Sequence, residues 1–245
     1  MEPVIEVDGL GIEFLRNRRY RLSLREMVFK GHSTSPRGTF WALRNVSFSV
    51  GPGEAVGLVG GNGQGKSTLL KLIAGVLLPD EGSVRVNGGV APLIELTGGF
   101  IGDLTARDNI WLTGRLHGLS REQIAERFDE IVDFAEVRES LDTPFRHFSS
   151  GMQVRLGFAV ITTLEEPIVL VDEVLAVGDK RFREKCYERM ESLVDEGRTL
   201  FLVSHSERDL ERFCKRGLYI EGGQVRADGP VADALAQYNA DQQRK

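Results

Sequence analysis

A glycine-rich segment early in the chain has the residue types and spacing of a phosphate-binding loop. Gly60-Gly61-Asn62-Gly63-Gln64-Gly65-Lys66-Ser67 matches G-x-x-x-x-G-K-[ST], the P-loop pattern. The glycines allow the backbone to curl so that successive N–H groups point at phosphate oxygens. In such a loop Lys66 reaches the β- and γ-phosphates, and the Ser67 hydroxyl is a ligand for Mg²⁺. The pattern therefore predicts a nucleoside triphosphate site, although it does not say what hydrolysis drives.

A strand has to lead into this loop and a helix has to follow it. Residues 54–59 form a short apolar run typical of a buried strand, and residues 68–74 predict a helix that stops at Gly75. The first turn of that helix, which includes Thr68, adds free N–H groups and the positive end of the helix dipole. A glycine turn that merely links a strand to a helix is the alternative, but it leaves Lys66 without a role.

Two later apolar runs end in polar side chains. Residues 168–171 lead into Asp172 and Glu173, and residues 200–203 lead into Ser204 and His205. Open α/β sheets bind ligands at the carboxyl ends of their strands. We expect Asp172 to hold Mg²⁺ through water, Glu173 to polarise the attacking water, and His205 to hydrogen-bond the γ-phosphate. The alternatives are a strand that ends in a solvated turn and a purely structural histidine.

A further polar segment, Ser149-Ser150-Gly151-Met152-Gln153, opens a predicted helix that continues through Val160. Serines at a helix start suit capping, and glycine permits close approach to another surface. The exposed N–H groups of a helix N-terminus form an anion site. Because this segment lies far along the chain from the P-loop, it need not face its own nucleotide.

The bulk properties restrict the class of partner. The net charge of −5 is a poor electrostatic match for nucleic acid. The two cysteines, Cys186 and Cys214, lack metal-site spacing and are expected to be reduced thiols. We expect no signal peptide and no membrane-spanning segment, so any work at a membrane must go through a partner. The basic segment 16–38, with a short amphipathic helix expected at 22–29, suits a membrane surface, a solvated loop or a docking contact.

Strands interleaved with helices predict an α/β fold with a mostly parallel sheet covered on both faces. The early alternating strands predict a separate antiparallel patch. The mostly helical residues from about 103 to 165 form an inserted lobe, and we expect one domain over residues 1–245.

The P-loop, the segment 149–153, Asp172-Glu173 and His205 occur in the order and rough spacing of the ATPase subunit of ABC transporters, which the chain resembles over nearly its whole length. Residues 149–153 are similar to the LSGGQ signature of that family, and residues 174–179 to its D-loop. The resemblance implies a P-loop NTPase fold with a RecA-like core, an antiparallel β subdomain and a helical subdomain. It also implies ATP, Mg²⁺, and two copies paired head to tail, each ATP lying between one P-loop and residues 149–153 of the other copy.

The resemblance assigns two further residues. Phe14 lies where the family has the aromatic ring that stacks on adenine, with Trp41 as the alternative. Glu95 stands near the position of the family's glutamine and is expected to touch Mg²⁺ or its water.

Three features are similar to those of one branch of the family, the bacterial exporters of lipid-linked polysaccharides such as O-antigens, teichoic acids and galactans. They are the replacement at Glu95 and the sequences of residues 149–152 and 172–179. This similarity implies a homodimer at the cytoplasmic face of the inner membrane, joined to a separate transmembrane permease. Some members carry a C-terminal carbohydrate-binding domain, and because the chain ends at Lys245 we expect none here. The rivals are another type of exporter, a non-transport ABC ATPase acting on DNA or ribosomes, and an unrelated P-loop kinase or GTPase.

Overall fold

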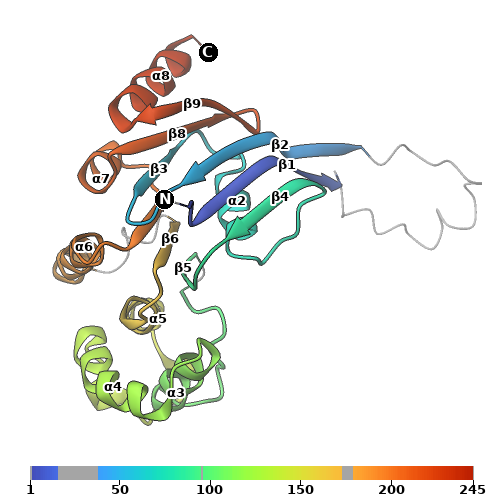
Figure 1. Cartoon of the computed structure of the whole chain (residues 1–245). Helices are drawn as coiled ribbons and strands as arrows, with labels where there is room; N and C mark the ends of the chain where they lie inside the picture. The colour runs from blue at the N-terminus through green and yellow to red at the C-terminus, as the bar shows by residue number, and fades with distance from the viewer. Residues whose placement is uncertain (1, 16–37, 95, 173–178, 245) are drawn as a thin grey trace, which may run out of the picture.

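The computed structural model describes residues 2–15, 38–94, 96–172 and 179–244. Its elements form two sheets and a helical lobe (Figure 1). The basic segment and the short helix expected at 22–29 lie outside the described residues.

The smaller sheet is antiparallel, with strand order β2-β1-β4. Its strands are β1 (Ile5–Leu15), β2 (Thr39–Val50) and β4 (Glu81–Val86). Along β2 the side chains of Val46, Phe48 and Val50 are buried, and those of Ser47 and Ser49 between them are exposed. This alternation is typical of a strand with one face on the core and one face in solvent.

The larger sheet has six strands in the order β5-β6-β7-β3-β8-β9, all parallel except the edge strand β9. The strands are β3 (Ala55–Val59), β5 (Val90–Leu93), β6 (Ile168–Asp172), β7 (Thr199–Val203), β8 (Arg216–Glu221) and β9 (Gln224–Pro230). Every residue of β7 is buried because helices or the other sheet cover both faces.

The helical lobe lies between β5 and β6 in the chain and extends beside that end of the sheet in Figure 1. Capping boxes start two of its helices, with Thr105 and Asp108 at one N-terminus and Ser120 and Gln123 at the other. The lobe consists of α3 (Ala106–Leu116), α4 (Arg121–Ala135), α5 (Ser150–Thr163) and the short 3₁₀ turns η1 (Arg138–Ser140) and η2 (Phe145–His147).

The remaining helices connect or follow the strands of the larger sheet. These are α2 (Lys66–Ile73), α6 (Lys180–Asp195), α7 (Glu207–Phe213) and α8 (Val231–Gln243). The helix α2 follows β3 directly after the P-loop, and Ala74 and Gly75 end it as the sequence predicts. The strand–loop–helix order required for a phosphate site is therefore present.

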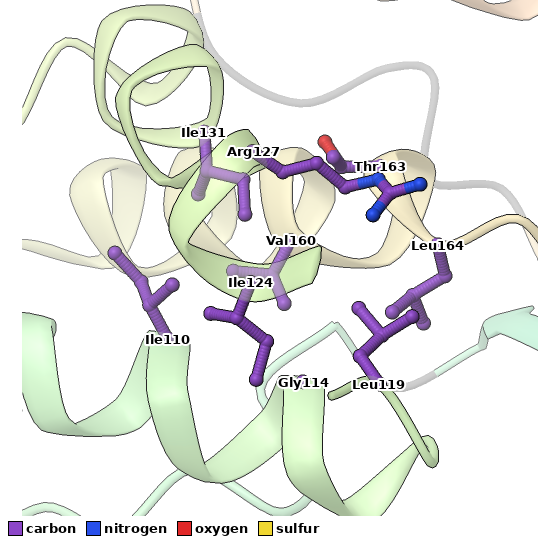
Figure 2. Close-up of a pocket in the computed structure, with 9 residues that line it drawn as sticks. All are labelled: Ile110, Gly114, Leu119, Ile124, Arg127, Ile131, Val160, Thr163 and Leu164. Atoms are coloured by element: carbon purple, nitrogen blue, oxygen red, sulfur yellow. The ribbon is translucent and has the colours of Figure 1, made fainter. Parts of the chain in front are cut away.

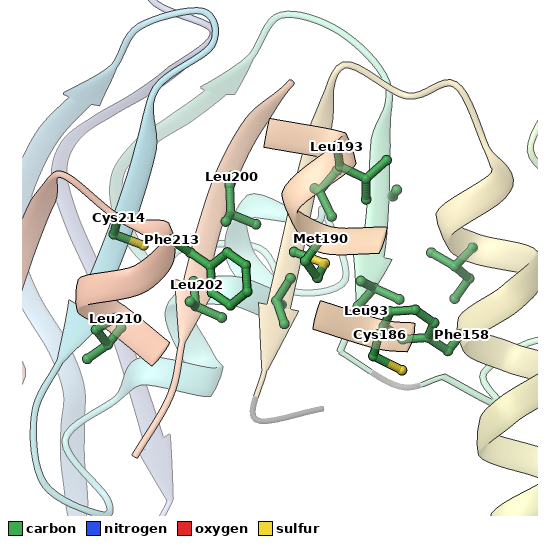
Figure 3. Packing of buried hydrophobic residues seen from close by; sticks show 14 of the residues in the cluster. Leu93, Phe158, Cys186, Met190, Leu193, Leu200, Leu202, Leu210, Phe213 and Cys214 are labelled. Atoms are coloured by element: carbon green, nitrogen blue, oxygen red, sulfur yellow. The ribbon is translucent and has the colours of Figure 1, made fainter. Parts of the chain in front are cut away.

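The hydrophobic core lies on both faces of the larger sheet. One cluster joins β1, β2 and α2 to Leu170, Phe201 and other residues on one face. The second cluster packs α6 and α7 on the opposite face, with Leu200, Leu202 and both cysteines among its members (Figure 3). Burial raises the pKa of each cysteine thiol to about 12. The lobe has a third cluster of its own.

The predicted fold class is confirmed, including the parallel core, the antiparallel sheet and the helical lobe. Sequence patterns did not predict strand β5. It is a short edge strand that contains Pro92. An edge strand tolerates proline because the backbone on its outer side makes no hydrogen bonds to a neighbouring strand.

Replacement of Gly82 by alanine should destabilise the antiparallel sheet more than the same change at Gly75. Both glycines have φ +72°, but an added Cβ would overlap the carbonyl oxygen of Asp8 at Gly82 and would contact nothing within 4 Å at Gly75. We expect Gly75→Ala to cost about 1–2 kcal/mol through φ alone. Gly82→Ala should cost about 1–3 kcal/mol more because the backbone of β1 must move. Urea unfolding measures both, and equal losses would contradict this packing.

Candidate nucleotide-binding site

The P-loop backbone is pressed against two neighbouring strands. Gly60 has φ +154°, and an added Cβ would lie 2.5 Å from the carbonyl oxygen of Ile220 at the end of β8. Gly65 has φ +95°, and its Cβ would lie 2.6 Å from the carbonyl oxygen of Ala42 in β2. Both positions require glycine, for conformation and for space. The loop is thus held in its curled shape by contact as well as by its own turns.

The lysine of the loop is placed to meet an anion. Lys66 is only 6% exposed, and its Nζ donates hydrogen bonds to Gly60 O at 2.7 Å and to Gly61 O at 2.9 Å. These carbonyls hold the ammonium group inside the loop. A buried positive charge beside curled backbone N–H groups is a fitting site for phosphate oxygens.

The start of α2 completes this anion site. Gly65 is the N-cap, and within the described residues no side chain caps the helix. The N-terminal N–H groups of such a helix are suited to an anionic ligand. Ser67 is exposed and Thr68 is half-buried in the first turn, while Asn62 and Gly63 are exposed at the tip of the loop.

The carboxyl ends of three strands bring the other predicted residues to the same edge as the loop. In the sheet register Val203 of β7 lies between Leu58 of β3 and Asp172 of β6. Neighbouring strands are about 4.8 Å apart, so Asp172 and the start of the P-loop lie on strands separated by about 10 Å. His205, two residues beyond Val203, is exposed at this edge. The predicted residues Glu95 and Glu173, and the D-loop positions 174–178, lie outside the described residues.

The segment 149–153 divides into an outward and an inward part. Ser149 is the N-cap of α5, accepts a hydrogen bond from Met152 N at 3.3 Å, and is exposed together with Ser150. Met152 packs against the lobe core, and the Gln153 amide donates to Phe145 O at 3.3 Å. Gly151 is half-buried between them. The polar atoms directed away from the lobe are therefore those of the serines at the helix N-terminus.

The two candidate aromatic residues lie in different surroundings. Phe14 packs against the same cluster as α2 and pairs with Phe40 at a ring separation of 6.0 Å. Trp41 lies opposite Glu13, close to Gly11, with the Arg44 guanidinium 5.2 Å from its ring centroid. Phe14 and its cross-strand partner Phe40 thus lie on one face of the strand pair, and Trp41 lies on the other. The sequence interpretation overlooked Phe40, although it immediately precedes Trp41.

A small cavity in the lobe is a poor candidate for the nucleotide (Figure 2). Among its lining residues, Thr163 donates to Ala159 O and Arg127 is paired with Glu165. The rest of the lining is apolar and comes from α3, α4, α5, Leu119 and Leu164. Because the polar side chains named here already have partners and the remaining lining is apolar, the cavity is a poor site for phosphate.

An ionic network, defined by Glu136, Arg155, Asp179 and Lys185, connects the lobe to α6. Arg155 on α5 binds Glu136 at 2.8 Å and also binds Asp179, which caps α6 through Phe182 N at 2.9 Å. Lys185 binds the other oxygen of Glu136. The Lys185 hydrogen bond holds the pKa of Glu136 below its ordinary value, and the Phe182 N–H and then Arg155 lower the pKa of Asp179. Sequence analysis missed this network because its members are separated in the chain.

The described site defines a class of protein. It has a P-loop with a buried lysine, followed by a helix N-terminus, at the carboxyl edge of a parallel sheet that also carries Asp172 and His205. This arrangement is that of a P-loop nucleotide-binding protein.

Comparisons with known proteins then show the family. Residues 43–176 match the ABC transporter family. The chain is 40% identical to the O-antigen export system ATP-binding protein RfbB of Klebsiella pneumoniae, over 97% of this chain and 98% of that protein. It is 41% identical to the teichoic acids export ATP-binding protein TagH of Bacillus cereus, over 82% of this chain and 36% of that protein. The chain belongs to the ABC transporter family.

Solved structures show the same fold. One is an ATP-binding subunit of an ABC transporter, which is 25% identical to this chain and superposes on it with a TM-score of 0.76. The superposition covers 96% of this chain and 93% of that subunit. The cassette MJ0796 bound to ADP and Pi is 22% identical and superposes with a TM-score of 0.73, over 93% of this chain and 98% of that one. At that identity the second likeness is one of fold.

Removal of Arg155 should weaken the protein in a pH-dependent way. The pKa values of Glu136 and Asp179 are lower in the folded state than in the unfolded chain. The network therefore stabilises the folded state at pH values above the ordinary carboxyl pKa, and this stabilisation is lost as the pH falls through the folded-state pKa values. We expect Arg155→Met to be less stable than the wild type at pH 7, with a smaller difference at pH 4, as measured by urea unfolding.

Arg138→Met is the matched control for this experiment. Arg138 pairs with Asp129 and Asp133 on α4 alone and is more exposed, so its loss should cost less. A difference between Arg155→Met and wild type that does not vary with pH would refute an ionic role for Arg155.

Proposed function

We propose that this chain binds and hydrolyses ATP as the nucleotide-binding subunit of a bacterial ABC transporter that exports lipid-linked polysaccharide across the inner membrane. The observation that carries the proposal is the meeting of three features at one sheet edge: the P-loop with Lys66, the carboxylate of Asp172, and His205. Membership of the ABC transporter family and the names of the similar proteins add the transport context.

Each of these residues takes a role in the proposed hydrolysis, as do Ser67 beside Lys66 and the sequence-predicted Glu95 and Glu173. The Lys66 ammonium exchanges its hydrogen bonds to Gly60 and Gly61 for phosphate oxygens, and the N–H groups of the loop and of α2 bind the remaining oxygens. Ser67 and Asp172, together with Glu95, would hold Mg²⁺, which would offset negative charge on the phosphates. Glu173 accepts a proton from the attacking water, and His205 orients that water by hydrogen bonding at the γ-phosphate.

The remaining donors come from a second copy of the chain. Ser149 and Ser150 are exposed at the N-terminus of α5, on the lobe beside β5 and β6, whereas the P-loop follows β3 further into the sheet. A head-to-tail dimer brings the serines of one copy to the nucleotide on the other, so that the site is complete only when two copies close. The related MJ0796 cassette is described as dimeric in its solved structures.

The work at the membrane requires another subunit. No helix in the described ranges is both long and apolar enough to cross a bilayer. In the proposed transporter a separate transmembrane permease carries the polysaccharide path, and the ATPase dimer docks on it at the cytoplasmic face; the export-system names of the similar proteins support this arrangement. The similar RfbB and TagH proteins are named for the export of O-antigen and of teichoic acids.

Loss of the Lys66 ammonium should abolish hydrolysis, and loss of the Glu173 carboxylate should trap the bound state. We expect Lys66→Ala to lower the rate of phosphate release by roughly 10²–10³ or more, because one preorganised donor to the reacting phosphate is removed. Glu173→Gln should bind ATP, hydrolyse it very slowly and elute as a dimer in size-exclusion chromatography.

Lys215→Ala, a change at an exposed lysine of the α7–β8 connection, is the control and should keep wild-type activity. Hydrolysis at the wild-type rate by Glu173→Gln would exclude Glu173 as the base. Strict preference for GTP would point to a different P-loop class.

Depletion of the chain in its host should remove the long polysaccharide from the cell surface. Lipid-linked polymer should accumulate inside the cell, as measured by gel analysis of surface and lipid-extracted fractions. Wild-type protein should restore export and Lys66→Ala should not. Unchanged surface polysaccharide would overturn the assignment of cargo, and co-purification with ribosomes or DNA, without a permease, would favour a non-transport ATPase.

A further inference from the structure

Three segments that are distant in sequence meet beside the P-loop. They are the turn Gly222–Gly223 between β8 and β9, the P-loop residues Gln64 and Gly65, and the β2 residues 42–44. Gly222 N donates to Gln64 Oε1 at 2.6 Å, a contact between residues 158 apart. On the other side of the turn, Arg44 N donates to Gly223 O at 2.9 Å. The turn is therefore hydrogen-bonded to the P-loop and to β2 at once.

One backbone carbonyl, that of Ala42, is the centre of this junction. An added Cβ on Gly65 would lie 2.6 Å from Ala42 O, and an added Cβ on Gly223 would also lie 2.6 Å from it. Gly65 has φ +95° and Gly223 has φ +72°, so both need glycine for conformation as well. The loop, the strand and the turn therefore pack around this carbonyl with no room for a side chain on either glycine.

The turn itself is held firmly. Arg216 at the start of β8 makes a two-pronged ion pair with Asp228 of β9, both contacts being 2.6 Å, and reaches Glu54 at 3.0 Å. At the other end of the hairpin Glu221 pairs with Gln224 in the sheet register. A hairpin fixed at both ends is suited to act as a rigid spacer.

The junction lies between the two parts of the nucleotide site. On one side Lys66 follows Gly65 directly. On the other side Phe40 precedes Ala42 by two residues, about 7 Å along an extended strand, and pairs with Phe14 at 6.0 Å. The β8–β9 turn thus sets the spacing between the residues that grip the phosphates and the rings that can stack on the base.

We infer that the β8–β9 turn is a positioning element for the nucleotide and that Gln64 is its positioning residue, acting through Gly222 rather than on the phosphates. The inference rests on the proposed ATP-binding function. Its physical basis is that a ligand with two linked binding groups gains affinity only when both receiving sites are held at the matching distance. Loosening the turn should remove the contribution of the base and leave the phosphate grip intact.

The test compares ATP with inorganic tripolyphosphate, which has the phosphates but no base. Gln64→Met keeps the length of the side chain and removes the oxygen that accepts from Gly222. By calorimetry in the presence of Mg²⁺, we expect the affinity for ATP to fall about 5- to 10-fold, the effect of one hydrogen bond. The affinity for tripolyphosphate should change less than about 2-fold, within the range of a neutral surface change.

Two further variants sharpen the comparison. Gln224→Met makes the same change beside the turn, at the start of β9, and should leave both affinities at the wild-type values. Gly223→Ala, which pushes against Ala42 O, should reproduce the selective loss of ATP affinity. If this variant fails to fold, the Gln64→Met result decides alone.

The outcomes separate this inference from the proposed function. If Gln64→Met lowers the affinities for ATP and for tripolyphosphate equally, Gln64 binds phosphate directly. If neither affinity changes, the hydrogen bond between Gln64 and Gly222 does not affect binding. Either result overturns the inference and leaves the proposed function standing. Failure of the wild-type chain to bind ATP would overturn the proposed function, and the inference with it.

Discussion

The whole site depends on how closely the P-loop backbone approaches its neighbours. Gly60 lies against the carbonyl of Ile220 and Gly65 against the carbonyl of Ala42, at distances that exclude any side chain. These contacts connect the loop to both sheets, so the phosphate-binding backbone is supported by the same strands that form the hydrophobic core. The buried ammonium of Lys66, held by carbonyls of the same loop, then has a fixed place from which to meet a triphosphate.

Sequence alone predicted the residues whose spacing is local and missed those brought together by folding. The P-loop, the strand before it and α2 follow from one continuous pattern, and Asp172 and His205 follow from apolar runs that end in polar side chains. Strand β5 was missed because its four residues include a proline and resemble a loop until β6 is placed beside them. The Gln64–Gly222 bond joins distant parts of the chain, and no local pattern reports it.

Ion pairs, in addition to the covalent chain, connect the helical lobe to the helix α6 that packs on the larger sheet. The first turn of α5 presents Ser149 and Ser150, and one turn later Arg155 binds Asp179, which caps α6 directly after residues 173–178. The helix that carries the outward-facing serines and the N-cap of α6 are therefore linked through a single side chain. Glu136, which joins the same network, adopts φ +58°, a conformation that non-glycine residues rarely take. This left-handed residue is the C-cap of α4, and its carboxylate pairs with both Arg155 and Lys185.

The two cysteines make the protein unusually convenient for site-specific spectroscopy. Both lie in the core, and a thiol with a pKa near 12 carries almost no thiolate at neutral pH. Maleimide dyes and nitroxide spin labels react with thiolate, so the native chain should take up little of either reagent. A single cysteine introduced on the surface of the lobe and another on the opposite side of the sheet would therefore report opening and closing motions without a cysteine-free background having to be engineered first.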